Sequence, residues 1–188
     1  MAGNLTILTI CGSLRKKSYN AALMRALPAL APAGMTLKNA PPWDGMPHYN
    51  ADIQDTTGFP PEVEDFAAAV RGADGIILVT PEYNWTIPGG LKNALDWVSR
   101  MKDQPFKEKP VAIQSASQGP VGGARMQYHM RMALTYLNCF VFGTPEVFVS
   151  MAQNKFDKET LALTDEQTKA FVKQQLEAFA KFIERVRA

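Results

Sequence analysis

The sequence has few residues that could build a metal site or a disulfide framework. Only two cysteines, Cys11 and Cys139, occur among the 188 residues, and neither belongs to a CxxC pair. The two histidines, His48 and His129, lie far apart in the chain, so we expect no metal site. Because both cysteines lie within apolar runs, we expect them to be buried as small hydrophobic residues.

An excess of charge of one sign is also missing. Lys and Arg number 20 against 18 Asp and Glu, a net charge of +2 that does not favour a nucleic-acid partner or a membrane surface. No apolar run approaches the roughly 18 residues of a transmembrane helix. The first residues also lack the basic segment of a secretory signal, and we therefore expect a cytoplasmic protein.

What the sequence does contain is an alternation of short apolar runs with segments of helical periodicity. A length of 188 residues, 46% of them hydrophobic, predicts a single domain over residues 1–188. The expected strands are Leu5–Cys11, Met35–Ala40, Gly75–Thr80, Val111–Ser115 and Phe140–Val149, the last interrupted by Gly143 and Pro145. The expected helices are Ser18–Leu30, Pro61–Arg71, Pro88–Met101, Gly122–Leu137 and Thr164–Arg187, with a long loop over Pro41–Pro60. Thr164 and Gln167 are expected to form a capping box at the start of the last helix. This alternation predicts an α/β fold with an open, mostly parallel sheet covered by helices on both faces.

The first candidate site follows the first expected strand and reads GSLRKKSYN over residues 12–20. A loop between a strand and a helix presents backbone N–H groups at the positive end of the helix dipole, which suits an anion. Ser13, Ser18 and Asn20 add neutral donors, and Arg15 adds a guanidinium group for a phosphate. The loop matches neither GxxxxGK[ST] nor GxGxxG, and its composition suits a mononucleotide such as FMN. A polar turn whose serine caps the helix is the alternative.

Two further candidate sites follow the third and fourth expected strands. The segment PEYNWTIPGGLKNA (81–94) is a rigid loop whose aromatic, amide and carboxylate side chains could flank a flat heterocycle. The segment SASQGPVGGAR (115–125) has small residues that let the backbone approach a ligand closely. Each segment alone is equally consistent with a structural turn. Because the carboxyl ends of parallel strands meet at one edge of a sheet, the three loops together favour a single pocket.

Nothing in the sequence favours nucleophilic catalysis, because there is no GxSxG motif and neither cysteine has a suitable partner. We therefore name no catalytic residue. Trp97 is expected to be a core or interface residue rather than a cofactor contact, and His129 to be structural or interfacial. Asp52 and Asp55 are expected to lie on a solvated edge.

Three motifs carry a resemblance to the NAD(P)H-dependent FMN reductase family. GSLRKKSYN is similar to that family's GSxRxxSxN phosphate loop, PEYNWTIPGGLKNALDW to its PEYNxSxPGxLKNAIDW block, and SASQGPVGGAR to its third loop. The resemblance covers nearly the whole chain and is greatest to soluble bacterial quinone reductases that also reduce chromate. It implies a flavodoxin-like three-layer sandwich with a five-stranded parallel sheet of order 2-1-3-4-5.

The resemblance also implies which positions contact FMN. The residues expected at the phosphate are Ser13, Arg15, Ser18, Asn20 and the Tyr19 amide. The residues expected along the isoalloxazine ring and ribityl chain are Pro81, Glu82, Tyr83, Asn84, Trp85 and Ser117. Trp85 stands where near relatives often carry tyrosine, a change that bears on access to the flavin.

The activity implied by the resemblance is a two-step hydride relay. NADPH or NADH would pass a hydride to flavin N5, and a quinone, or another acceptor such as chromate, would then receive both electrons. Two alternative functions would use the same cofactor site. One is that of a flavodoxin-like electron carrier, and the other is that of a flavin reductase that supplies reduced FMN to a monooxygenase. Such carriers are usually acidic, whereas this chain has a net charge of +2.

Members of the family are dimers or dimers of dimers, so the resemblance implies a homodimer or homotetramer. The segment Gly122–Leu137 has apolar residues on more than one helical face, which independently favours a second partner. In the segment Pro88–Met101, Trp97 and Met101 lie outside the expected core stripe. The candidate polar residues of such an interface are Arg125, Tyr128 and Glu146.

Overall fold

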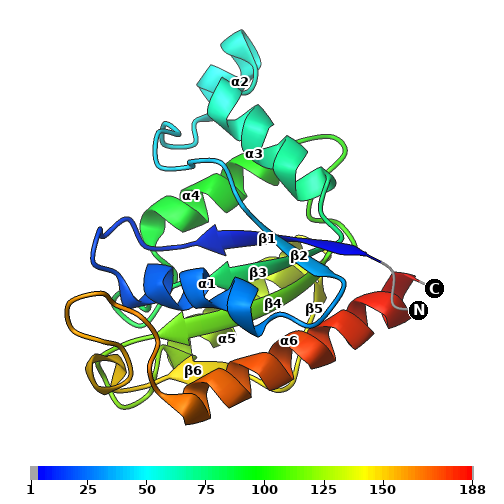
Figure 1. The fold of residues 1–188 in the computed structure, drawn as a ribbon. Coiled ribbons are helices and arrows are strands. Elements are labelled where there is room, and N and C mark those ends of the chain that lie inside the picture. Colours follow the sequence, from blue (N-terminus) through cyan, green and yellow to red (C-terminus); the bar gives the residue numbers. More distant parts are fainter. Residues whose placement is uncertain (1–3, 188) are drawn as a thin grey trace.

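The computed structural model describes residues 4–187, which form three layers with a central sheet between two groups of helices (Figure 1). The strands are β1 (Leu5–Cys11), β2 (Met35–Asn39), β3 (Gly75–Val79), β4 (Pro110–Ala116), β5 (Phe140–Val141) and β6 (Val147–Val149). The helices are α1 (Tyr19–Leu30), α2 (Ala51–Thr57), α3 (Pro61–Arg71), α4 (Gly89–Val98), α5 (Ala124–Tyr136) and α6 (Glu166–Arg187), with a short 3-10 helix η1 (Ala152–Asn154).

All strand pairs in the sheet are parallel, and the order β2-β1-β3-β4-β5 confirms the flavodoxin-like topology. The sheet has six strands rather than five, because the expected strand Phe140–Val149 is divided. Its first part, β5, pairs with Pro110–Val111, and its second part, β6, pairs with Gln114–Ala116 farther along β4. The interruption contains Pro145, whose missing N–H cannot join a strand ladder.

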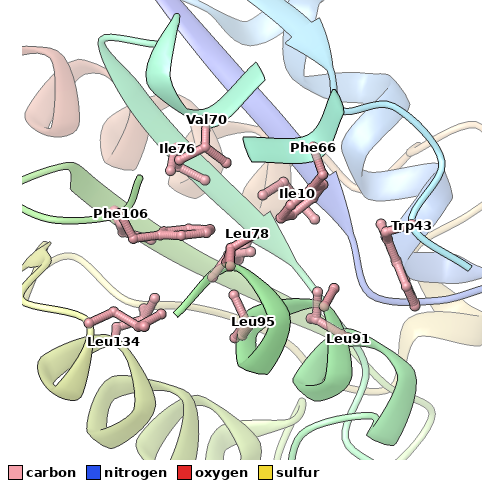
Figure 2. Packing of buried hydrophobic residues seen from close by; sticks show 14 of the residues in the cluster. Ile10, Trp43, Phe66, Val70, Ile76, Leu78, Leu91, Leu95, Phe106 and Leu134 are labelled. Atoms are coloured by element: carbon pink, nitrogen blue, oxygen red, sulfur yellow. The ribbon is translucent and has the colours of Figure 1, made fainter. Parts of the chain in front are cut away.

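The core has two halves, one on each face of the sheet. Every residue of β3 is buried, as expected for a central strand covered on both faces. On one face, α3, α4 and α5 bring side chains such as Phe66, Leu91 and Leu134 against β1 and β3 (Figure 2). On the other face, α1 and α6 cover the same strands (Figure 1). The two apolar layers fix the sheet, and the strand ends therefore present their loops at a defined edge.

The structure differs from the sequence interpretation most in the segment expected to be a long loop. That segment contains α2, whose first turn is capped by the Asn50 side chain. It also contains Trp43, which is 7% exposed and lies against α4, where a Cβ on Gly90 would come within 3.0 Å of its ring (Figure 2). Asp52 and Asp55 are exposed on α2, as expected of a solvated edge.

Three smaller expectations are corrected. The last helix is capped by Asp165, which accepts a hydrogen bond from the Thr168 N–H, and not by the expected pair Thr164 and Gln167. Trp97 and Met101 are 0% and 6% exposed, so both belong to the core and not outside its stripe, and of the two expectations for Trp97 the core position is confirmed. The two cysteines are only partly buried. Among residues 4–187, no helix is both long and apolar enough to cross a membrane.

Candidate functional site

Three loops meet at the carboxyl edge of the sheet, as the strand order requires. They follow β1, β3 and β4, which are neighbours in the sheet. Between them lies a solvent-open cavity of about 260 Å³. Its lining residues are Ser13, Arg15, Ser18, Tyr19, Asn20, Pro81, Glu82, Tyr83, Ala116, Ser117 and Gln118. The geometry therefore brings residues from positions 13 to 118 around one space.

Nine of the eleven residues that the sequence singled out line this cavity. Asn84 and Trp85 do not, and lie instead on the turn that follows Tyr83. Two lining residues, Ala116 and Gln118, were not singled out. Both belong to the segment SASQGPVGGAR, which the sequence analysis had identified as a candidate site. Within that segment, the small side chain of Ala116 and the amide of Gln118 gave no reason to choose them over their neighbours.

One end of the cavity has the donors that an anion requires. Ser18 is the N-cap of α1, and its hydroxyl accepts a hydrogen bond from the Ala21 N–H at 3.3 Å. The N–H groups of Tyr19 and Asn20, in the first turn, have no acceptor among residues 4–187. Arg15 is exposed beside them, so a guanidinium group and the positive end of a helix dipole face the same space.

The loop after β1 leaves the sheet in very close contact with the loop after β3. A Cβ on Gly12 would lie 2.0 Å from Thr80 Oγ1 and 3.0 Å from Leu91 Cδ2. Only glycine fits this approach, and any side chain at position 12 would force the two loops apart.

Asn20 ties the loop after β1 to the end of β4. Its Nδ2 donates to the Ala116 carbonyl at 2.9 Å, and its Oδ1 accepts from the Ala116 N–H at 2.9 Å. Both bonds are buried. The side chain therefore reaches across the end of β3 and holds two walls of the cavity together.

The loop after β3 makes a tight turn at the mouth of the cavity. Tyr83 and Thr86 exchange backbone hydrogen bonds of 3.1 and 3.0 Å, while Asn84 and Trp85 have φ angles of 49° and 67°. A left-handed conformation is uncommon for a bulky residue and costs about 1–3 kcal/mol. Trp85 nevertheless exposes 66% of its surface, and Arg125 from α5 lies over its ring at 4.7 Å.

The loop after β4 is fixed by the strand beyond it. The Ser117 N–H donates to Val149 of β6, and the Ser117 carbonyl accepts from the Ala152 N–H. The Ser115 hydroxyl, fully buried, donates to the Gly122 carbonyl at 2.6 Å. This wall is therefore rigid and leaves the Ser117 hydroxyl beside the cavity.

Both cysteines of the chain have thiol pKa values above the ordinary value. Burial raises the pKa of the Cys11 thiol, which therefore stays protonated at neutral pH. Burial also raises the pKa of Cys139, to about 12. His129 is exposed and lies 2.9 Å from the Thr86 hydroxyl through its Nδ1 atom, a structural contact. Within residues 4–187, no three His, Cys, Asp or Glu side chains cluster as a metal site would require.

Known proteins are similar to this chain over nearly its whole length. The model of the NADPH-dependent FMN reductase family matches residues 5–154. A quinone reductase of Escherichia coli strain K12 is 47% identical over 187 residues, across 100% of both chains. An NAD(P)H-dependent FMN reductase of Pseudomonas aeruginosa is 43% identical over 187 residues, again across 100% of both. A solved structure of the flavoenzyme FerB, an NAD(P)H:(acceptor) oxidoreductase from Paracoccus denitrificans, has a TM-score of 0.86 and 31% identity, over 96% of this chain and 98% of FerB.

The Asn20 side chain provides a test of the cavity's construction. Asn20→Ala should lower the free energy of unfolding by about 2–4 kcal/mol, because two buried backbone groups of Ala116 lose their partner. Urea unfolding followed by circular dichroism measures this. The matched control is Asn154→Ala, an exposed residue of η1, for which a change below about 0.5 kcal/mol is expected. Equal stability of the two variants would contradict the assigned role of Asn20.

Proposed function

The chain belongs to the NADPH-dependent FMN reductase family, and from this premise we propose that it is an FMN-dependent oxidoreductase that passes hydride from NAD(P)H to quinones. The observation that carries the proposal is the convergence of three loops on one cavity, with an anion site at one end. A full-length relative named quinone reductase supports the acceptor class. An oxyanion such as chromate is proposed as a further acceptor, because an open flavin face would discriminate little among acceptors.

The residues around the cavity fit FMN. A phosphate requires several donors and positive charge, which Arg15, the hydroxyls of Ser13 and Ser18, and the free N–H groups of the first turn of α1 provide. A flat ring requires rigid walls, which the Pro81–Tyr83 segment and the Ser117 loop provide. When bound, FMN supplies hydride transfer through its N5 atom, from NAD(P)H to the acceptor.

The chain's own contribution is binding, orientation and access. Ser13, Arg15 and Ser18 would hold the phosphate end in place. Tyr83, which is 49% exposed, stands at the open side, where the donor and the acceptor would take the same place in turn. No proton need be moved by a side chain, because the reduced acceptor can be protonated by water.

We also propose that the protein is a homodimer, or a homotetramer built from such dimers. The support is an exposed apolar stripe on α5, where Tyr128, Met132 and Tyr136 are 54%, 66% and 75% exposed at a spacing of four residues. A groove of about 230 Å³ between α4 and α5 adjoins Tyr136. Two expected interface residues have partners in their own chain, since Arg125 pairs with Glu82 and Glu146 with Arg131. A cytoplasmic location remains part of the proposal and is supported by the two free thiols.

The spectrum of the purified protein tests the proposed function directly. We expect a bound-flavin spectrum that bleaches when NADPH is added without oxygen and recovers when benzoquinone follows. A flavin spectrum that neither NADPH nor NADH bleaches would instead support an electron carrier. A colourless protein that takes up no added FMN would overturn the assignment of the cavity.

Arg15→Ala tests the anion site. Loss of a charge-assisted hydrogen bond should weaken FMN binding by about 1.5–3 kcal/mol, or roughly 10- to 150-fold in Kd. Quenching of FMN fluorescence on titration into the apoprotein measures the Kd. Lys107→Ala is the control, because it removes an exposed cation just before the amino end of β4, at the opposite edge of the sheet. Unchanged affinity in Arg15→Ala would count against the assignment.

Met132→Asp tests the proposed dimer. A carboxylate in the centre of the α5 stripe would be buried without a partner on association, so we expect sedimentation to show a monomer at micromolar concentration. The control is Phe171→Asp, a 44%-exposed position on α6, which should leave the oligomeric state unchanged. A monomeric wild-type protein would refute this part of the proposal.

A further inference from the structure

Glu82 lies in the loop that lines the cavity, yet α5 engages both of its carboxylate oxygens. Oε2 accepts a hydrogen bond from the Met126 N–H at 3.2 Å. Oε1 lies 3.5 Å from Arg125 Nη1, and the Glu82 side chain is only 11% exposed. The negative charge of Glu82 is therefore balanced by the helix rather than left for a ligand.

Helix α5 needs this carboxylate because it has no cap of its own. Its N-cap is Gly123, with a φ of 90°, and a Cβ there would lie 2.8 Å from the Ser115 side chain. No acidic residue occurs in its first turn. Met126 is the third residue of the helix, and the backbone N–H at this position usually donates a hydrogen bond to the side chain of the N-cap residue. Glu82 thus supplies, from another loop, both the missing hydrogen bond and the negative charge that a helix N-terminus favours.

The first turns of α5 also hold the strained turn that follows Glu82. Arg125, paired with Glu82, covers one face of the Trp85 indole at 4.7 Å. His129, one turn farther along α5, contacts the Thr86 hydroxyl at 2.9 Å. Residues 84 and 85 have the two left-handed conformations of a type I′ turn, for which Asn-Gly is the favoured pair. Tryptophan at the second position therefore needs external support.

We propose that Glu82 is a positioning residue for the cofactor loop. By capping α5 it orients Arg125 over Trp85, and this contact holds the strained turn at the mouth of the cavity. The effect on FMN passes through the geometry of the turn and not through a bond from the Glu82 carboxylate to the cofactor. The FMN part rests on the proposed function, whereas the part that concerns the turn depends on the protein alone.

Trp85 reports on the turn in the apoprotein, because Trp43 and Trp97 are 7% and 0% exposed while Trp85 is 66% exposed. Acrylamide quenching of tryptophan fluorescence therefore follows Trp85. In Glu82→Ala and in Arg125→Gln, the indole face now covered by Arg125 should open, so we expect the quenching constant to rise by about a half. Glu64→Ala, an exposed glutamate of α3, is the matched control and should leave it unchanged.

FMN affinity separates positioning from direct contact. Glu82→Ala should raise the Kd for FMN about tenfold, and Glu82→Gln less, because an amide oxygen can still accept from the Met126 N–H. In a Trp85→Gly background, Glu82→Ala should no longer raise the Kd for FMN, since glycine removes the strain and creates Asn-Gly at the turn. A lost direct contact would raise the Kd equally in both backgrounds.

Two results would overturn the proposal. One is wild-type quenching of Trp85 in a folded Glu82→Ala protein, with folding verified by its thermal melt. The other is an equal loss of FMN affinity on Glu82→Ala in the wild-type and Trp85→Gly backgrounds, which would make Glu82 a direct ligand. If the wild-type protein binds no FMN, the proposed function fails, and the quenching measurement still decides the role of Glu82 in the turn.

Discussion

The paired hydrogen bonds between the Asn20 amide and the Ala116 backbone are the contact on which the shape of the site depends. In the sheet, β3 lies between β1 and β4, so the loop after β1 can reach the end of β4 only by passing over the end of β3. Asn20 makes that connection with two hydrogen bonds of 2.9 Å, one donated to the Ala116 carbonyl and one accepted from the Ala116 N–H. The loops after β1 and β4 thereby become two walls of the cavity, and Pro81, Glu82 and Tyr83, which follow β3, line the space between them.

A second constraint is the interruption between β5 and β6, where backbone groups leave the strand ladder. Side chains from the helices on both faces supply the partners. Gln127 of α5 donates to the Val147 carbonyl and Gln175 of α6 to the Pro145 carbonyl, each at 2.8 Å. Arg131 donates to the Phe142 carbonyl at 2.9 Å. These bonds offset the cost of leaving backbone carbonyls unpaired near the core, and they fix β6, which in turn holds the loop that carries Ser117.

The parts of the fold that could be predicted are those that repeat a simple pattern. The buried run Gly75–Val79 and the stripe of Pro61–Arg71 lie where the apolar periodicity placed them, because burial on both faces or on one face leaves a direct mark on composition. Trp43 left no such mark, since a single buried aromatic in a Pro-rich segment has no period. The site was predictable as a convergence of loops. Which of its residues bind a ligand and which hold the loops together was not predictable, because a polar residue such as Asn20 or Glu82 can do either.

The family match includes the residues of the site but not helix α6, which helps to hold the sheet in place. Residues 5–154 contain every residue that lines the cavity, whereas α6 lies beyond them. Helix α6 nevertheless covers one face of the sheet, and a Cβ on Gly75 would lie 2.7 Å from Ile183 and 3.2 Å from Phe179. Substitutions in α6 therefore act first on the stability of the sheet. Gln175 connects α6 to the chain on both sides of the Ser117 wall, because it donates to the Pro145 carbonyl before β6 and accepts from the Gln114 side chain of β4 at 2.8 Å.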